Sequence, residues 1–233
     1  MKYRATTFPV ANEAWPFAVP LAVVVAIALA FHLYWSATIL GVLLVYVIAF
    51  FRNPQRRAIG GPDNIIAPAD GKIVAAGIVS HPDFEDGSAL RVAIFMSLFN
   101  CHVNWAPCGG RVAKCDYYPG QFLNAMDDKS SEVNERKVMT VEHAGGQTLI
   151  VKLVAGLVAR RIVCPIGAND TLEAGEKIGL IRFGSRAEVL LPANSELLVK
   201  PGMMVRGGET LLAVLKPARV TTQESAVAAG AAS

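Results

Sequence analysis

The chain reads Ala67-Pro68-Ala69-Asp70-Gly71-Lys72-Ile73-Val74 where a turn rich in proline, aspartate and glycine leads into a β-type run. After Arg57 this pattern recurs, because short β-type runs alternate with Gly, Pro, Asp and Asn at intervals of roughly 8–15 residues. Such spacing is typical of a compact β sandwich or barrel. The strands that we expect are Lys72–Val79, Ala89–Ser97, His102–Pro107, Lys137–Glu142, Thr148–Ala155, Lys177–Arg182, Glu188–Leu191, Glu196–Val199 and Thr210–Leu215.

A second stretch, Val199–Leu212, echoes the first, and both look like the β-sandwich modules that carry biotin or lipoate. Those modules present a modified lysine at a hairpin tip, and no such lysine tip stands at a short distance between these two segments. The echo therefore indicates the fold, and the function only weakly. We expect a mainly β domain with lipoyl- or biotinyl-like halves, preceded by an α-helical membrane hairpin.

The hairpin is expected at residues 17–51, which contain no Asp, Glu, Lys or Arg. About 35 residues are too many for one membrane span of about 20 and slightly few for two, so a tight hairpin or a re-entrant anchor fits best. Basic residues flank both ends, which favours a cytoplasmic location for both ends and for residues 1–16. A buried hairpin in a soluble protein is the alternative. The flanking residues are Lys2, Arg4, Arg52, Arg56 and Arg57.

The amino-acid composition indicates which kinds of binding partner suit this chain. The net charge of +3 is modest, and the arginines beside the anchor suit an anionic lipid surface better than nucleic acid. The four cysteines form no Cys-x-x-Cys pair and have no matching histidine spacing, so we expect free thiols and no metal site. Residues 52–220 form the expected main domain, in which the polar stretch Gln121–Arg136 is predicted to be a mobile loop. Residues 221–233 are predicted to be a disordered tail.

The dipeptide Gly184-Ser185 carries a specific chemical possibility. Glycine tolerates a strained turn in which the hydroxyl of the following serine reaches the preceding carbonyl. Attack of Ser185 on the carbonyl of Gly184 would convert the amide into an ester, elimination would leave dehydroalanine, and hydrolysis would give a pyruvoyl group. A glycine-serine pair taken alone is most often an ordinary turn.

Five sequence motifs that occur in a fixed order favour self-cleavage at Gly184-Ser185 over an ordinary turn. They resemble the short, membrane-anchored, archaetidylserine-decarboxylase-like phosphatidylserine decarboxylases of bacteria and archaea, over nearly the whole stretch from Phe50 to Leu215. Each motif alone is weak, whereas five in register are strong. The motifs are Phe50-Phe51-Arg52-Asn53-Pro54, Ala67-Pro68-Ala69-Asp70-Gly71, Phe95-Met96-Ser97 through His102-Val103-Asn104 to Pro107, Asn134-Glu135-Arg136, and Phe183-Gly184-Ser185.

The resemblance implies self-cleavage between Gly184 and Ser185. A membrane-bound β chain, residues 1–184, and a small α chain, residues 185–233, would remain together as a heterodimer. The pyruvoyl group derived from Ser185 would be the cofactor. It would form a Schiff base with phosphatidylserine and release CO2 to give phosphatidylethanolamine, because such a group can accept the electrons that decarboxylation leaves behind. A homo-oligomer is a further expectation.

The resemblance also implies that two other residues assist the reaction of Ser185. In related enzymes of a longer type an aspartate and a histidine assist the serine, and Asp70 and His102 match them. The longer type carries a second histidine three residues later, where this chain has Trp105. His102 then serves as base for self-cleavage, as proton donor to the carbon that loses CO2, or as both, since an imidazole with a pKa near neutrality suits either task.

The sequence indicates least clearly which residues bind the substrate. A poorly solvating pocket for the substrate carboxylate is expected to be lined by Phe95, Phe99, Trp105 and Phe183. Arg136 is expected to hold the phosphate, with an ion pair to Glu135 or Asp116 as the alternative. Arg186 either attracts the anionic head group or is a solvated surface residue.

A rival function keeps the same fold class. A membrane-anchored, non-enzymatic adaptor with a lipoyl-like module would remain one uncleaved polypeptide. The enzyme, in contrast, would lie at the cytoplasmic face of the inner cell membrane with its site at the bilayer surface.

Overall fold

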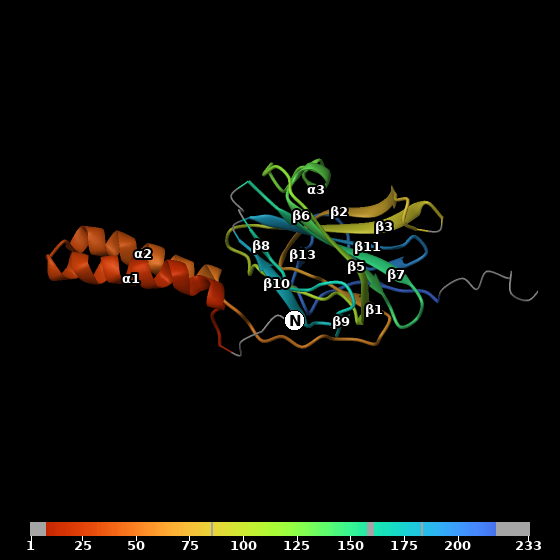
Figure 1. Ribbon diagram of the computed structural model, residues 1–233, viewed down its shortest axis with the longest axis horizontal. Helices are drawn as coiled ribbons and strands as arrows, with labels where there is room; N and C mark the ends of the chain where they lie inside the picture. The colour runs from red at the N-terminus through yellow and green to blue at the C-terminus, as the bar shows by residue number, and fades with distance from the viewer. Residues whose placement is uncertain (1–7, 85, 158–160, 183, 218–233) are drawn as a thin grey trace, which may run out of the picture.

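Two apolar helices form a rod that projects from a β domain in the computed structural model of the chain (Figure 1). The structure describes residues 8–84, 86–157, 161–182 and 184–217. The rod consists of α1 (Trp15–Ala30), preceded by the short 3-10 helix η1 (Asn12–Ala14), and α2 (Tyr34–Phe50). The expected hairpin is therefore confirmed, and its first helix begins two residues before the predicted anchor.

The hairpin turns at its tip and closes at its base. His32 adopts a φ of 57° between the two helices, which reverses the chain direction within three residues. At the base, the Ala11 amide donates to the Phe51 carbonyl at 2.8 Å, and the Asn53 amide donates to the Pro9 carbonyl at 2.7 Å. Both ends of the hairpin therefore leave from the same end of the rod, as the expected common location of the two ends requires.

The rod exposes apolar side chains over most of its length, including Phe31, Trp35 and Ile39. The segment Asn12–Ala30 is long and apolar enough to cross a membrane, whereas the 17 residues of α2 extend over about 25 Å, slightly less than a hydrocarbon core of about 30 Å. Exposed apolar surface of this extent marks a surface that is covered by another partner. Insertion of the rod into a bilayer stays a prediction.

An eight-stranded antiparallel sheet, curled into a half-barrel, forms most of the β domain (Figure 1). Its strand order is β13-β2-β3-β11-β7-β6-β5-β9, so β11 lies in the middle. Its strands are β2 (Gly71–Ser80), β3 (Ser88–Met96), β5 (Gly110–Tyr118), β6 (Arg136–Glu142), β7 (Thr148–Ala155), β9 (Thr171–Leu172), β11 (Ser185–Pro192) and β13 (Met204–Val205).

Two three-stranded sheets complete the domain, in the orders β1-β14-β12 and β4-β10-β8. Their strands are β1 (Asn64–Ile66), β14 (Leu211–Val214), β12 (Glu196–Leu197), β4 (Val103–Trp105), β10 (Lys177–Ile181) and β8 (Ile162–Val163). The two echoing segments of the sequence meet in space, because Met204 pairs with Lys72 and Val205 with Gly71. The mainly β fold class is confirmed.

Strand β11 is buried on both faces. On one face Ala187, Val189 and Leu191 belong to the main hydrophobic core. On the other face lie Arg186 and Glu188, both fully buried. Because successive side chains of a strand point to opposite sides, the strand combines an apolar and an ionic environment within eight residues.

Three local predictions need correction. Strand β5 was not expected, because a bulge between Val112 and Lys114 interrupts its alternation of apolar and polar residues. Strand β11 begins at Ser185 instead of Glu188, since Arg186 and Glu188 neutralise each other inside the sheet. The stretch Gln121–Arg136 is more ordered than a polar loop: it contains the short helix α3 (Ser130–Val133) and several buried residues.

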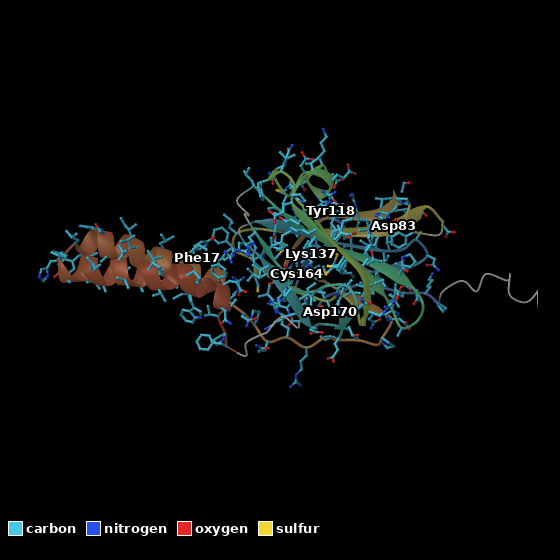
Figure 2. The ribbon with its side chains drawn as sticks, in the orientation of Figure 1. Phe17, Asp83, Tyr118, Lys137, Cys164 and Asp170 are labelled. Atoms are coloured by element: carbon cyan, nitrogen blue, oxygen red, sulfur yellow. The ribbon has the colours of Figure 1, made fainter. Side chains whose placement is uncertain are left out.

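The predicted disordered tail lies outside the described residues. All four cysteines are free thiols, as expected. Burial raises the pKa of Cys164 to about 11 and that of Cys108 to about 12, so both are protonated at neutral pH. Lys137 lies beside Cys164 (Figure 2), and its half-buried ammonium donates to the carbonyl oxygens of Cys164 and Ile166 at 2.6 and 2.7 Å.

Candidate active site

The proposed cleavage bond lies where a loop enters the central strand. Gly184 has a φ of 69°, a left-handed conformation that glycine adopts without strain, and Ser185 is the first residue of β11. Ser185 is fully buried between Met96 of β3 and Ala155 of β7. Its hydroxyl donates to the Met96 sulfur at 3.1 Å. Because a thioether is a weak acceptor, this contact holds the hydroxyl only lightly.

A close backbone approach covers the Gly184 carbonyl. A Cβ placed on Gly156 would lie 2.5 Å from the Gly184 oxygen and 3.0 Å from the Cβ of Ala125. Leu98 approaches Gly184 from another loop, with its Cδ2 3.9 Å from an ideal Cβ on that glycine. Three separate loops therefore meet at this bond, and Gly156 is a site residue that the sequence did not single out.

His102 lies directly against the cleavage site. Its Nε2 accepts a hydrogen bond from the Gly184 amide at 3.2 Å, and its Nδ1 lies 3.1 Å from the Asn100 carbonyl oxygen. A carbonyl only accepts and an amide only donates, so the proton resides on Nδ1 and the Nε2 lone pair faces Gly184. The ring stacks on Phe50 with centroids 4.3 Å apart.

Burial sets the charge state of His102. The side chain is fully buried, and this loss of solvation, reinforced by the cation of Arg52, lowers the pKa of His102 to about 4. The imidazole is therefore neutral at physiological pH, with a lone pair available to take up a proton. The structure brings His102 to Gly184, and a catalytic role for His102 stays a prediction.

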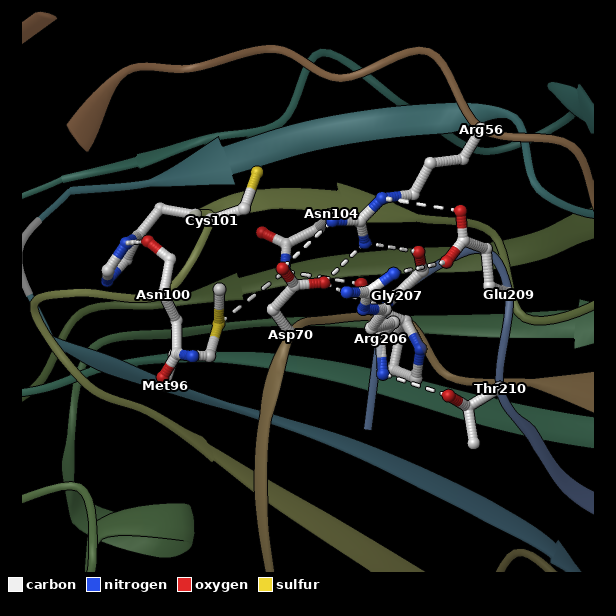
Figure 3. A network of polar contacts seen from close by, with 12 residues as sticks. Arg56, Asp70, Met96, Asn100, Cys101, Asn104, Arg206, Gly207, Glu209 and Thr210 are labelled. Atoms are coloured by element: carbon white, nitrogen blue, oxygen red, sulfur yellow. Dashed lines mark hydrogen bonds and ion pairs between the residues drawn. The ribbon is translucent and has the colours of Figure 1, made fainter. Parts of the chain in front are cut away.

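Asp70 occupies a different, ionic environment (Figure 3). Arg56 binds both carboxylate oxygens, with its Nη2 2.9 Å from Oδ2, and the Gly207 amide donates to Oδ1 at 2.8 Å. The guanidinium of Arg56 also lies over the Trp105 ring, 4.5 Å from its centroid. Among the described residues Asp70 has no hydrogen bond to His102 or Ser185. It acts on His102 through its charge, which opposes the lowering of the pKa of the imidazole.

Asn104 and Met96 connect the two environments, and the sequence assigned neither a role. The Asn104 amide nitrogen lies 3.8 Å from the Met96 sulfur, the same sulfur that accepts from Ser185 (Figure 3). It also lies 3.5 Å from the Pro68 carbonyl oxygen, while the Asn104 Oδ1 is buried without a partner among the described residues. The only available signal was its place in the His-Val-Asn motif.

The residue after Ser185 lies in an ionic cluster on the opposite side of β11. Arg186 Nε donates to Glu188 at 2.6 Å, and its Nη2 donates to Asp128 at 2.6 Å. Ser131 donates to Glu188 at 2.8 Å. Arg186 is fully buried, so both expectations for it, a solvated surface residue and a head-group contact, are wrong. The cluster fastens the start of β11 to the segment that contains α3.

The predicted substrate residues have other surroundings. Arg136 donates to the carbonyl oxygens of Glu132 and Asn134 at 2.5 and 3.3 Å and stacks over Tyr118. Trp105 is fully buried. Phe183 lies outside the described residues. Substrate-binding roles for these three residues stay predictions.

The base of the hairpin contacts the loop next to the cleavage bond. Tyr46 of α2 donates its hydroxyl to the Leu98 carbonyl at 3.2 Å, and Arg52 Nη2 donates to the Phe99 carbonyl at 2.8 Å. Phe99 is 80% exposed, with its ring edge-on to Tyr46. The site therefore lies at the end of the β domain from which the apolar rod emerges.

Comparisons with known proteins agree with this geometry. The family model described as phosphatidylserine decarboxylase matches residues 43–213. A phosphatidylserine decarboxylase proenzyme of Burkholderia vietnamiensis is 41% identical over 210 residues, which cover 89% of this chain and 96% of the relative. The proenzyme of the same name from Burkholderia multivorans is 40% identical with the same coverage. The chain therefore belongs to the phosphatidylserine decarboxylase family of carboxy-lyases.

Proposed function

We propose that this chain is a proenzyme that cuts itself between Gly184 and Ser185 and then decarboxylates phosphatidylserine to phosphatidylethanolamine. The observation that carries the proposal is the contact between the neutral imidazole of His102 and Gly184, beside a buried serine. A base next to a nucleophile is the arrangement that activates serine in covalent catalysis. Family membership supports the decarboxylase activity, and the adaptor alternative does not explain it.

The self-cleavage proceeds in balanced steps. The Ser185 hydroxyl loses its proton and attacks the Gly184 carbonyl, the C–N bond breaks, and the amide becomes an ester. Removal of the Ser185 α-proton breaks the bond between Cβ and oxygen, which leaves a carboxylate on Gly184 and dehydroalanine at position 185. Water then replaces the nitrogen, which departs as ammonia. The overall change consumes one water and requires no oxidant.

His102 is the proposed base for the first step. Ser185 must turn its hydroxyl away from Met96 to reach the imidazole, and it loses only a weak contact with sulfur by doing so. The left-handed Gly184 and the absence of a Cβ on Gly156 leave space around the carbonyl that is attacked. Asp70 is proposed to assist electrostatically, since its negative charge acts against the lowering of the His102 pKa by burial and by Arg52.

The residues present suit a pyruvoyl group at position 185. The position is fully buried, on a strand held between two neighbours, so a reactive carbonyl formed there would be shielded from water. Such a group supplies an electrophilic carbonyl that takes up the substrate amine and the electrons released with CO2. His102 would then hold or deliver a proton at the reacting carbon.

The membrane location belongs to the same proposal. The rod would place the site at the cytoplasmic face of the inner membrane, where an anionic phospholipid reaches it without leaving the bilayer. Contacts from Tyr46 and Arg52 to the loop beside Gly184 support this arrangement. The proposal also includes a homo-oligomer.

Denaturing electrophoresis tests the proposal. By residue count from the 24.8 kDa total, the active protein should give fragments of about 20 and about 5 kDa, the smaller with a blocked N terminus. Ser185→Ala should leave one intact band, whereas Ser195→Ala, in the same fragment but outside the site, should be cut normally. Borohydride with substrate should trap an adduct on the small fragment alone. An unbroken chain with an unmodified Ser185 in active material would refute the proposal.

A further inference from the structure

The contact between His102 and Gly184 has a second consequence if the chain is cut. The Gly184 amide that donates to His102 Nε2 belongs to the residue that would become the new C terminus. This inference rests on the proposed self-cleavage. It concerns the carboxylate that the cut leaves behind.

The cut changes the charge of the site. Gly184 gains a carboxylate, which retains the oxygen of Ser185. The other new end gains no ammonium, because its nitrogen leaves as ammonia. One negative charge is therefore created beside the imidazole without a compensating cation.

Covalent geometry keeps that charge close to the ring. The carboxyl carbon of Gly184 lies two bonds from its own nitrogen, about 2.5 Å away. The nitrogen lies 3.2 Å from His102 Nε2, so the carboxylate carbon lies within about 6 Å of the Nε2 that takes up the proton. A protonated Nε2 donates and no longer accepts from the Gly184 amide, so on protonation the carboxylate of the same residue replaces the amide as the partner of the ring. At such separations an opposite charge stabilises the protonated form of a histidine.

The other groups around His102 do not cancel the effect. The Asn100 carbonyl on Nδ1 already favours a protonated ring, and Phe50 is uncharged. Arg52 acts against protonation and Asp70 acts for it. The carboxylate of Asp70 is itself bound by Arg56, so the new Gly184 carboxylate would be the nearest negative charge without an arginine partner.

We propose that the C-terminal carboxylate of Gly184 is a catalytic counter-ion that converts His102 from a neutral base in the uncut chain into a proton donor in the cut enzyme. After CO2 departs, the electron pair of the broken C–C bond forms a C–H bond with the proton of His102 Nε2. The neutral imidazole then regains a proton from water. Cleavage thus separates the two tasks of one histidine in time.

Proton titration of ¹⁵N-histidine-labelled protein by NMR tests this inference without relying on activity. The sample pair is the full-length, self-cleaved wild type and uncut Ser185→Ala, with the uncut fraction of slowly processed Gly156→Ala as a second reference that retains Ser185. In the uncut chains His102 should stay neutral from about pH 8 to about pH 5, because its pKa is about 4. In the cut protein the midpoint should rise by about 2 pH units.

His143 is the internal control, because its ring is bound by Gln147 and the Pro62 carbonyl and has no contact with Gly184 among the described residues. Its side-chain NMR signals at neutral pH should be the same in all three samples. Mass measurement of the chains is the first readout: an unbroken wild type overturns both this inference and the proposed function. Two fragments with an unchanged His102 midpoint overturn this inference alone.

Discussion

Asp70 and His102 occupy neighbouring environments that differ in how firmly their polar atoms are held. Arg56 and the Gly207 amide bind the carboxylate of Asp70 through three hydrogen bonds. Among the described residues, in contrast, His102 Nε2 has a single neutral contact of 3.2 Å, and the Ser185 hydroxyl has only the Met96 sulfur. The firmly held carboxylate stabilises the fold, while the loosely held groups retain freedom to react.

Typical interaction free energies support this difference between Asp70 and His102. Removing one partner of a buried ion pair costs about 3–5 kcal/mol, whereas a neutral hydrogen bond contributes about 1 kcal/mol net. A proton transfer to Asp70 would require the loss of its ion pair with Arg56. The same transfer to His102 gives up one weak contact. The comparison therefore predicts that substitutions at His102 affect chemistry first and substitutions at Asp70 affect stability first.

His102→Ala should have the largest effect. Loss of the proposed base should slow self-cleavage by about 1,000-fold, since general bases contribute about 10²–10⁴ to such steps. The cut fraction is followed over time by denaturing electrophoresis. His143→Ala removes another buried histidine and should be processed at a normal rate if it folds. Normal processing of His102→Ala would remove the imidazole from the mechanism.

Gly156→Ala should have the next largest effect. Its new Cβ would lie 2.5 Å from the Gly184 oxygen, so the bond that is attacked must shift. A displacement of about 1 Å in a reacting group costs about 100-fold in rate. Gly61→Ala is the matched control, because no atom lies within 4 Å of the corresponding Cβ position. Equal processing of the two variants would show that the close approach is irrelevant.

Asp70→Asn should combine a moderate chemical effect with a clear loss of stability. Arg56 would be left buried without its carboxylate, which should cost about 3 kcal/mol in the free energy of unfolding. Loss of the Asp70 negative charge, which acts against the lowering of the His102 pKa, should make His102 a weaker base and slow cleavage by about tenfold, equivalent to one pKa unit. Chemical denaturation and the cleavage assay measure the two effects separately.

The double variant Arg56→Gln/Asp70→Asn sharpens this test. If Asp70 acts through its charge, removal of the arginine should restore most of the cleavage rate. If Asp70 accepts the Ser185 proton itself, the double variant should remain as slow as the single one. The first outcome is expected, because Asp70 has no hydrogen bond to Ser185 among the described residues.

The pH dependence should be the smallest effect. Self-cleavage needs neutral His102, whose pKa is lowered to about 4, so its rate should change less than about twofold between about pH 8 and about pH 5. An ordinary histidine would lose half its neutral form at pH 6.5. Initial rates with freshly refolded protein measure this. A rate that halves near pH 6.5 would contradict the burial of His102.

The same shift affects stability. The unfolded chain binds a proton at His102 near pH 6.5, and the folded chain does so only near pH 4. The stability that His102 contributes is therefore complete above about pH 6.5 and is lost as the pH falls through about 4.

Regular patterns were readable from the sequence, and irregular ones were not. The charge-free residues 17–51 indicated the hairpin, and alternating apolar runs indicated most long strands. Strand β5 was not predicted, because its bulge breaks the alternation of apolar and polar residues. The start of β11 was not predicted, because Arg186 and Glu188 are charged. Charged residues inside a strand become acceptable only when their partners come from distant segments, as Asp128 and Ser131 do here.

The candidate site divides in the same way. Ser185, Gly184 and His102 were predicted from their motifs, and His102 does contact Gly184. Asp70 was also predicted, but its sequence context gave no sign of Arg56, which lies 14 residues earlier and binds it. Gly156 carries no chemical signal in the sequence, because its importance is a close approach to the backbone of Gly184. The role of Met96 depends on its sulfur, which only the fold brings to the Ser185 hydroxyl.

Local chemistry, namely which residue types stand next to each other along the chain, determined the apolar anchor, the glycine-serine bond and the family. Tertiary structure alone decided which histidine nitrogen faces that bond, which carboxylate is already neutralised, and how little water reaches the serine. These depend on groups far apart in sequence that the curled sheet brings within about 3 Å, where hydrogen bonds and desolvation act.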